Sequence, residues 1–124
     1  MSIERALPSL RDIEGVYGSF TLNTTGELTA RDLPAVFDDL TLAQSGERIA
    51  RLWEVLSENE APEYTWIEFA EYCLFLRGLS VHGRAAGCLC VVVPATVNLL
   101  ALRLASKWVA RSLDRDPPPI AASA

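Results

Sequence analysis

A stretch of 18 residues without a charged side chain, Ala85 to Leu102, constrains the fold of this chain more than any other feature. Its length is close to the lower limit for a membrane-spanning helix, and it contains a Cys-x-Cys pair, Cys88 and Cys90. Pro94 divides the stretch into two parts. The first is a β-branched run of strand length, whereas the second has Leu and Ala at helical spacing. We therefore expect a strand, a turn and a helix here, and no membrane insertion.

The composition is that of one globular domain. The chain has 124 residues, of which 50% are apolar and 22% charged, so it is long enough for one core but too short for two. Its net charge of −5 disfavours nucleic acid as a partner, because phosphate-backbone binding needs a basic surface. The N-terminus has no signal or transit pattern, so we expect a cytoplasmic protein. We expect one domain over residues 2–113 and a disordered, Pro-rich tail over 114–124.

The predicted order of elements is α-β-β-α-β-β-β-α. Apolar residues three and four apart indicate a short first helix, which Pro8 interrupts. In the last helix, Leu104 and Trp108 belong to a broad apolar arc that we expect to pack on a sheet. The other predicted segments are a hairpin over 16–33, a helix from an N-cap at Asp38 to Ser57, strands over 64–69 and 72–79, a loop over 80–87 and a strand over 88–93.

The second predicted helix has a patch without bulky side chains. Ala43, Gly46 and Ala50 form this patch, close to the apolar stripe that includes Trp53. Small residues allow another helix to approach closely, so the patch is a candidate contact for a partner. The alternative is that Gly46 faces the protein's own sheet and that Trp53 is a core residue.

The predicted strand over 64–69 is apolar on both faces. Tyr64 and Trp66 share one face, while Ile67 and Phe69 lie on the other, so the strand needs cover on both sides.

No motif for catalysis, a metal or a cofactor is present. The only histidine, His82, lies between loop residues without metal-ligand spacing. Cys88 and Cys90 point to the same face of a strand, which we expect the C-terminal helix to cover. No second Cys or His pair accompanies them, which favours core packing over zinc binding. The chain has no P-loop and no Gly-x-Ser-x-Gly motif. We therefore expect a binding protein and no enzymatic activity, catalytic residue, metal or cofactor.

Three segments resemble the Roadblock family, which includes dynein light chain Roadblock and the bacterial protein MglB. GVYGSFTLNTTGELTARDLPAVF is similar to the family's first hairpin, with Asn23 in place of the usual Asp. EYCLFLRGL followed by GCLCVVV resembles the fourth and fifth strands. VNLLALRLASKWV is similar to the final helix, with Asn98, Leu99 and Arg103 at characteristic positions. The resemblance covers about residues 3 to 113.

The resemblance implies a Roadblock-like (profilin-like) α/β sandwich, with a five-stranded antiparallel sheet and helices on both faces. It further implies a homodimer that pairs third strands edge to edge and second helices side by side. The implied partner is a small Ras-like GTPase (MglA-like) or another Roadblock protein. Some family members stimulate GTP hydrolysis by such a GTPase without supplying an arginine of their own. The expected interface residues are Ala43, Gly46, Ala50, Trp53, Tyr64, Trp66 and Ile67.

Two other functions are compatible with the residues. A sandwich of this shape can carry a pocket between sheet and helices, so the chain could be a small-ligand sensor. A thiol enzyme would have to use Cys88 and Cys90.

Overall fold

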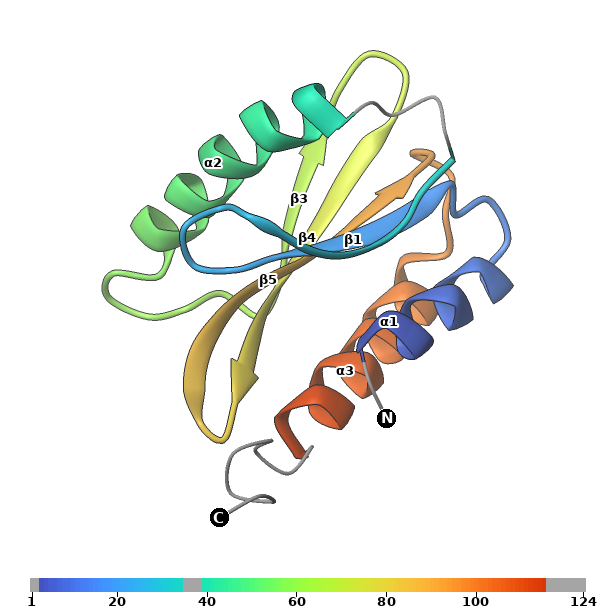
Figure 1. The fold of residues 1–124 in the computed structure, drawn as a ribbon. Helices are drawn as coiled ribbons and strands as arrows, with labels where there is room; N and C mark the ends of the chain where they lie inside the picture. Colours follow the sequence, from blue (N-terminus) through green and yellow to red (C-terminus); the bar gives the residue numbers. More distant parts are fainter. Residues whose placement is uncertain (1–2, 35–38, 116–124) are drawn as a thin grey trace.

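The computed structural model describes residues 3–34 and 39–115, in which helices cover both faces of one sheet (Figure 1). The elements, in chain order, are α1 (Ile3–Ala6), a 3-10 helix η1 (Leu7–Asp12), β1 (Gly18–Leu22), β2 (Leu28–Asp32), α2 (Asp39–Leu56), β3 (Thr65–Glu68), β4 (Cys73–Val81), β5 (Arg84–Val93) and α3 (Leu99–Arg115). This confirms the predicted order and the predicted sandwich.

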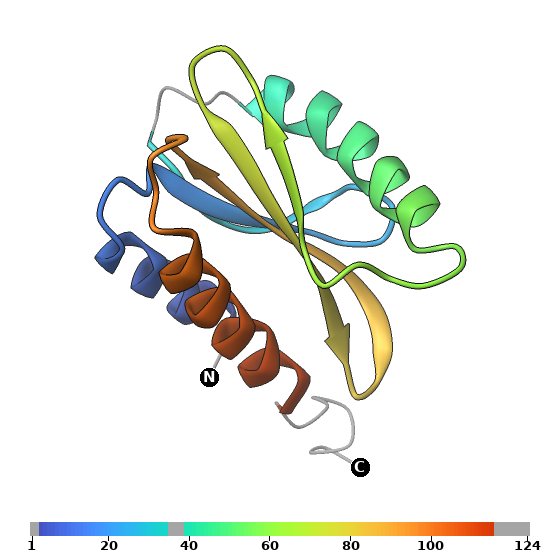
Figure 2. The same ribbon diagram turned by 180° about the vertical axis from the view of Figure 1, so that it is seen from behind.

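The sheet has five strands in the order β2-β1-β5-β4-β3, and every neighbouring pair is antiparallel. β5 lies at the centre, which fits its run of buried apolar residues from Cys88 to Val93. Both edges of the sheet are short strands, β2 and β3. β4 and β5 extend beyond the start of β3 as a long hairpin, so that part of β4 has no neighbour on its outer side (Figure 2).

Alternating residues of β4 and β5 build two separate cores. Phe75 and Val91 point to the side covered by α1, η1 and α3, whereas Leu76 points to the side covered by α2. Cys88 and Cys90 are buried free thiols, as expected, but they face α2. Our expectation that the C-terminal helix covers them was wrong, because the register of β5 puts its even-numbered residues on the α2 side.

The segment 80–87, predicted as a loop, is mostly strand. His82 and Gly83 form a two-residue turn, and both have positive φ, 53° and 78°, as a type I′ turn requires. A register shift follows between Leu79 and Ser80 of β4, opposite Gly87 of β5. Gly87 has a φ of 116°, and a Cβ there would lie 1.8 Å from the carbonyl oxygen of Leu22. The glycines thus shape a hairpin instead of ending it.

The first helix is short because Pro8 lies in the first turn of η1, where a missing N–H costs no hydrogen bond. The last helix begins after Asn98, whose side-chain oxygen accepts a hydrogen bond from the N–H of Ala101 (3.1 Å). It continues to Arg115, two residues past the predicted end of the domain. The predicted N-cap Asp38 and the tail residues 116–124 lie outside the described residues.

The buried face of α3 differs from the predicted one. Leu102 and Val109 are buried, but Leu104 and Trp108 are 63% and 51% exposed. The prediction was wrong at these two positions because the apolar arc of α3 is wider than the face that touches the sheet. Among the described residues, no helix is both long and apolar enough to cross a membrane.

Candidate functional site

The outer edge of β3 presents free peptide groups. The N–H of Phe69 donates to the carbonyl of Tyr72 (2.8 Å), which fixes these two residues as a hydrogen-bonded pair of the β3–β4 hairpin. Peptide groups alternate in direction along an antiparallel strand. Those of Trp66 and Glu68 therefore point away from β4, and they form no further backbone hydrogen bond within the described chain. This edge can accept another strand.

The side chains of β3 pack on both faces, as predicted. Trp66 packs against the core under α1 and α3, while Ile67 packs against the core under α2. Tyr64, just before the strand, stacks on Phe75 with ring centroids 5.2 Å apart. The guanidinium of Arg103 lies 5.0 Å from the centroid of the Tyr64 ring on the same side of the sheet. These contacts fix the strand as an ordered edge.

The small residues of α2 mostly face the protein's own sheet. A Cβ on Gly46 would lie 2.5 Å from the carbonyl oxygen of Gly26 in the β1–β2 turn. Ala50 is buried, and the ring of Trp53 lies where a Cβ on Gly78 would be, 2.8 Å from Cζ2. The contact of Gly46 with the hairpin was the alternative that the sequence left open. Ala43 alone of the patch is exposed.

Three large apolar side chains on α2 were not among the predicted interface residues. Leu52, Val55 and Leu56 are 39%, 57% and 41% exposed. Val55 and Leu56 lie three and four residues after Leu52, so the three side chains form a second apolar strip on α2 beside the one that meets the sheet. The spacing of these three residues was visible in the sequence. The sequence alone could not show which apolar residues of α2 face solvent and which, such as Ile49 and Trp53, face the core.

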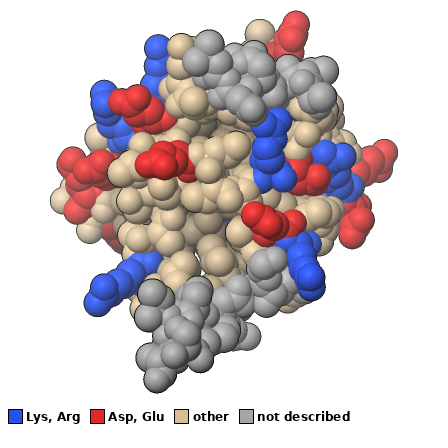
Figure 3. Space-filling model, viewed as in Figure 1, with Lys and Arg blue, Asp and Glu red and all other residues tan. Residues whose placement is uncertain are grey.

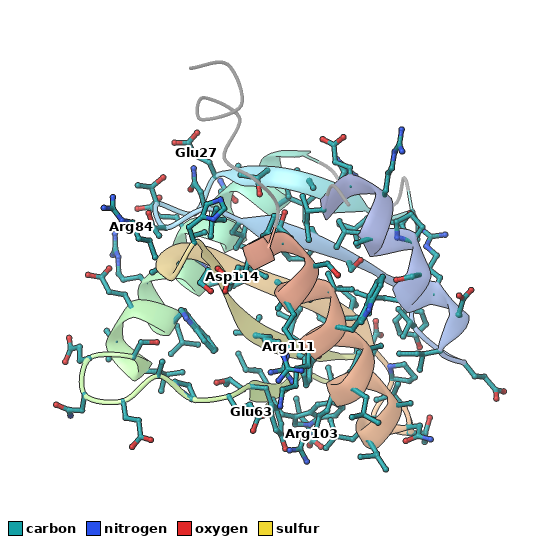
Figure 4. The ribbon with its side chains drawn as sticks, turned by 90° about the horizontal axis from the view of Figure 1, so that it is seen from below. Glu27, Glu63, Arg84, Arg103, Arg111 and Asp114 are labelled. Atoms are coloured by element: carbon teal, nitrogen blue, oxygen red, sulfur yellow. The ribbon has the colours of Figure 1, made fainter. Side chains whose placement is uncertain are left out.

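A cluster of cations surrounds one carboxylate between β4 and α3. Arg77 is buried, and its guanidinium donates to Ser106 Oγ (2.9 Å) and to the carbonyl oxygens of Glu63 and Arg103 (3.2 Å each). The Glu63 carboxylate lies 3.8–3.9 Å from Arg77, Arg103 and Lys107. Burial lowers the pKa of Arg77, while the Glu63 carboxylate raises it. Figure 4 shows Glu63 next to Arg103 below α3.

An open cavity of about 770 Å³ lies where β4 has no outer neighbour. Trp53 of α2 and Ser57, the residue after the helix, line one side, and Lys107 and Arg111 of α3 line the other. Peptide groups alternate in direction along β4, and those of Leu74 and Leu76 point toward β3. The peptide groups of Gly78 point in the same direction, beyond the start of β3 and into this space. On the face drawn in Figure 3, acidic and basic side chains gather around an uncharged area, so the surface there has no dominant charge.

The cysteine pair has the environment of a packed core. The Sγ atoms of Cys88 and Cys90 are 4.0 Å apart. Burial raises the pKa of Cys90 well above its ordinary value, while the hydrogen bond between the two thiols lowers the pKa of Cys88. Cys73 lies on the other face of the sheet, and burial raises its pKa too. Within residues 3–34 and 39–115, no three His, Cys, Asp or Glu side chains are placed to hold a metal ion.

Comparison with solved structures identifies the fold. A Roadblock/LC7 domain from Streptomyces avermitilis superposes with a TM-score of 0.71 at 12% identity, covering 90% of this chain and 94% of that one. MglB from Myxococcus xanthus gives 0.71 at 17% identity, covering 98% and 96%. An MglB structure described as a tetrameric arrangement gives 0.70 at 18% identity, covering 91% and 85%. No protein-family model and no curated protein sequence matches this chain.

The chain therefore has the Roadblock fold, in agreement with the resemblance of its hairpin, its paired strands and its final helix. The structural neighbours are Roadblock and MglB proteins, and at these identities the likeness concerns the fold.

Proposed function

We propose that this protein is a homodimeric adaptor or regulator of the Roadblock type, which binds a small Ras-like GTPase (MglA-like) or another Roadblock protein. The observation that supports this proposal is the outer edge of β3. Free peptide groups at Trp66 and Glu68 would promote aggregation in a monomer, and pairing with the β3 of a second copy removes them from solvent. One sheet then continues across both subunits.

The interface combines β3 with the outer side of α2. Trp66, Ile67 and the preceding Tyr64 support the edge from both faces of the sheet. On α2, the contact consists of the exposed apolar strip Leu52, Val55 and Leu56, whereas exposed Ala43, one of the predicted residues, lies on the other side of the helix. Gly46, Ala50 and Trp53 contribute indirectly, because they set the distance between α2 and the sheet.

The proposed activity is regulation of a partner rather than chemistry by this chain. The paired α2 helices form the surface that a GTPase contacts, and the protein either stimulates GTP hydrolysis by reshaping the partner's site or only scaffolds it. Cell polarity, motility or scaffold signalling in the cytoplasm is the corresponding process. MglB is the fold neighbour that suggests this role, and its tetrameric arrangement suggests that dimers can assemble further.

Light scattering tests the dimer. Two chains of 13.6 kDa give an expected mass of about 27 kDa (2 × 13.6). Ile67→Lys puts a charge on the interface and should give monomer or insoluble protein. A wild-type monomer at micromolar concentration would show that the interface proposal is wrong.

Co-purification with small Ras-like GTPases from the same source, loaded with GTP or GDP, tests the partner. Binding with faster GTP hydrolysis indicates a GTPase-activating role, and binding without it indicates an adaptor. If neither these GTPases nor any co-expressed Roadblock protein binds a confirmed dimer, the proposed function is wrong although the interface stands.

The cavity beside β4 supports a second candidate function, a small-ligand sensor. Its volume of about 770 Å³ is in the range of ligand pockets, and its lining combines the Trp53 ring with Lys107 and Arg111. A bound ligand would raise the melting temperature by mass action. Thermal scanning with a metabolite panel distinguishes the two candidates, with Arg111→Ala as the variant that removes a cation from the lining.

A further inference from the structure

An apolar ridge lies on the outer side of α3, away from the sheet. Leu100, Leu104 and Trp108 are spaced four residues apart, so their side chains follow one another along the helix. They are 64%, 63% and 51% exposed. Buried Leu102 and Val109 hold the opposite side of α3 on the sheet, so the orientation of the ridge is fixed. Three large apolar side chains in one exposed row are unusual on a surface without a partner.

A row of cations runs beside this ridge. Arg103, Lys107 and Arg111 are also four residues apart, and helical geometry places them next to the apolar row. The Glu63 carboxylate forms ion pairs with Arg103 and Lys107, and it also pairs with the buried Arg77. Arg111 has no ion-pair partner in the described part of the chain. Asp114 follows Arg111 by three residues, and its carboxylate accepts a hydrogen bond from the N–H of Gly83 (3.1 Å). The three cations of the row still outnumber its two carboxylates, Glu63 and Asp114, although the protein carries a net charge of −5.

We propose that the outer face of α3 binds an acidic amphipathic helix of a partner protein. The apolar side of that helix packs on Leu100, Leu104 and Trp108, and its Asp or Glu side chains pair with Lys107 and Arg111. The i, i+4 ridge suits packing between helices, in which such a ridge enters a groove of the partner helix. The excess positive charge selects an acidic sequence.

Two other occupants fit the face less well. In a twofold contact between copies of this chain, the same patch meets itself, so the cations of one copy would border those of the other. An anionic membrane would attract the cations but would repel a protein with a net charge of −5. An acidic amphipathic helix contacts both the apolar ridge and the row of cations, and it avoids both kinds of charge repulsion.

Fluorescence anisotropy with the dimeric protein tests this proposal. The probe is a fluorescein-labelled peptide of about 18 residues, about five helical turns, with Leu three and four apart and Glu on the flanks. Leu104→Ser should weaken its binding about tenfold or more, because one buried Leu contributes roughly 1.5–3 kcal/mol. Arg111→Glu should weaken it as well, and added salt should reduce the wild-type affinity. Docking should also shift the emission of Trp108 to the blue, a change that Trp108→Phe removes.

The matched control is Val55→Ser, which removes an equally exposed apolar side chain from α2. It should leave peptide binding unchanged even where it weakens the proposed dimer, so failure of one proposal is separable from failure of the other. Absence of peptide binding, or equal binding of a scrambled peptide of the same composition, overturns the proposal. Binding to phosphatidylglycerol-containing vesicles instead, lost in Leu104→Ser, assigns the face to a membrane and also overturns it.

Discussion

Arg77 links α3 to the sheet by hydrogen bonds. It is 6% exposed and donates to Ser106 Oγ and to two carbonyl oxygens, an arrangement that needs a planar fork of donors. Arg77→Lys keeps the charge but loses this fork, so we expect it to lower the free energy of unfolding by about 1–3 kcal/mol. Urea denaturation measures this. Arg51→Lys, at an exposed i,i+4 pair with Glu47, is the control and should change stability by less than about 0.5 kcal/mol.

Gly46 distinguishes packing within the chain from packing between chains. Ala is a better helix former than Gly by about 1 kcal/mol, but its Cβ would meet the Gly26 carbonyl at 2.5 Å. The neighbour is backbone and cannot rotate away, so the overpacking cost of about 1–3 kcal/mol should exceed the helical gain. Gly46→Ala should therefore destabilise the fold at every protein concentration, as thermal unfolding can measure. A loss of stability only at concentrations where dimers form would instead restore the partner-helix hypothesis.

Among elements, β3 allows a test that leaves its own hairpin intact. The N–H of Glu68 points away from β4, so Glu68→Pro removes an outward donor without breaking a hydrogen bond to β4. We expect this variant to be a folded monomer in light scattering, with the circular dichroism of the wild type. Glu68→Ala, which keeps the N–H, should remain dimeric. A dimeric Glu68→Pro would show that the β3 edge is not the interface.

The sequence allowed the elements to be predicted better than their faces. The alternation of Tyr64, Trp66 and Ile67 and the hairpin over 16–33 are local signals, and both predictions were confirmed. The side of the sheet that Cys88 faces depends on register across the sheet, which no local pattern carries. The exposure of Trp108 depends on which part of a wide apolar arc touches the sheet. These properties arise from long-range packing.

At the scale of the whole molecule, association and stability should be linked. A dimer that unfolds to separate chains gains about 1.4 kcal/mol of apparent stability for each tenfold rise in concentration. For a dimer of about 248 residues (2 × 124), this corresponds to a rise in melting temperature of roughly 3–5 °C per tenfold. Differential scanning calorimetry over two decades of concentration measures this shift. The Glu68→Pro variant should melt at one temperature throughout, since no association contributes to it, and a wild type that behaves the same way would exclude the dimer as the source of stability.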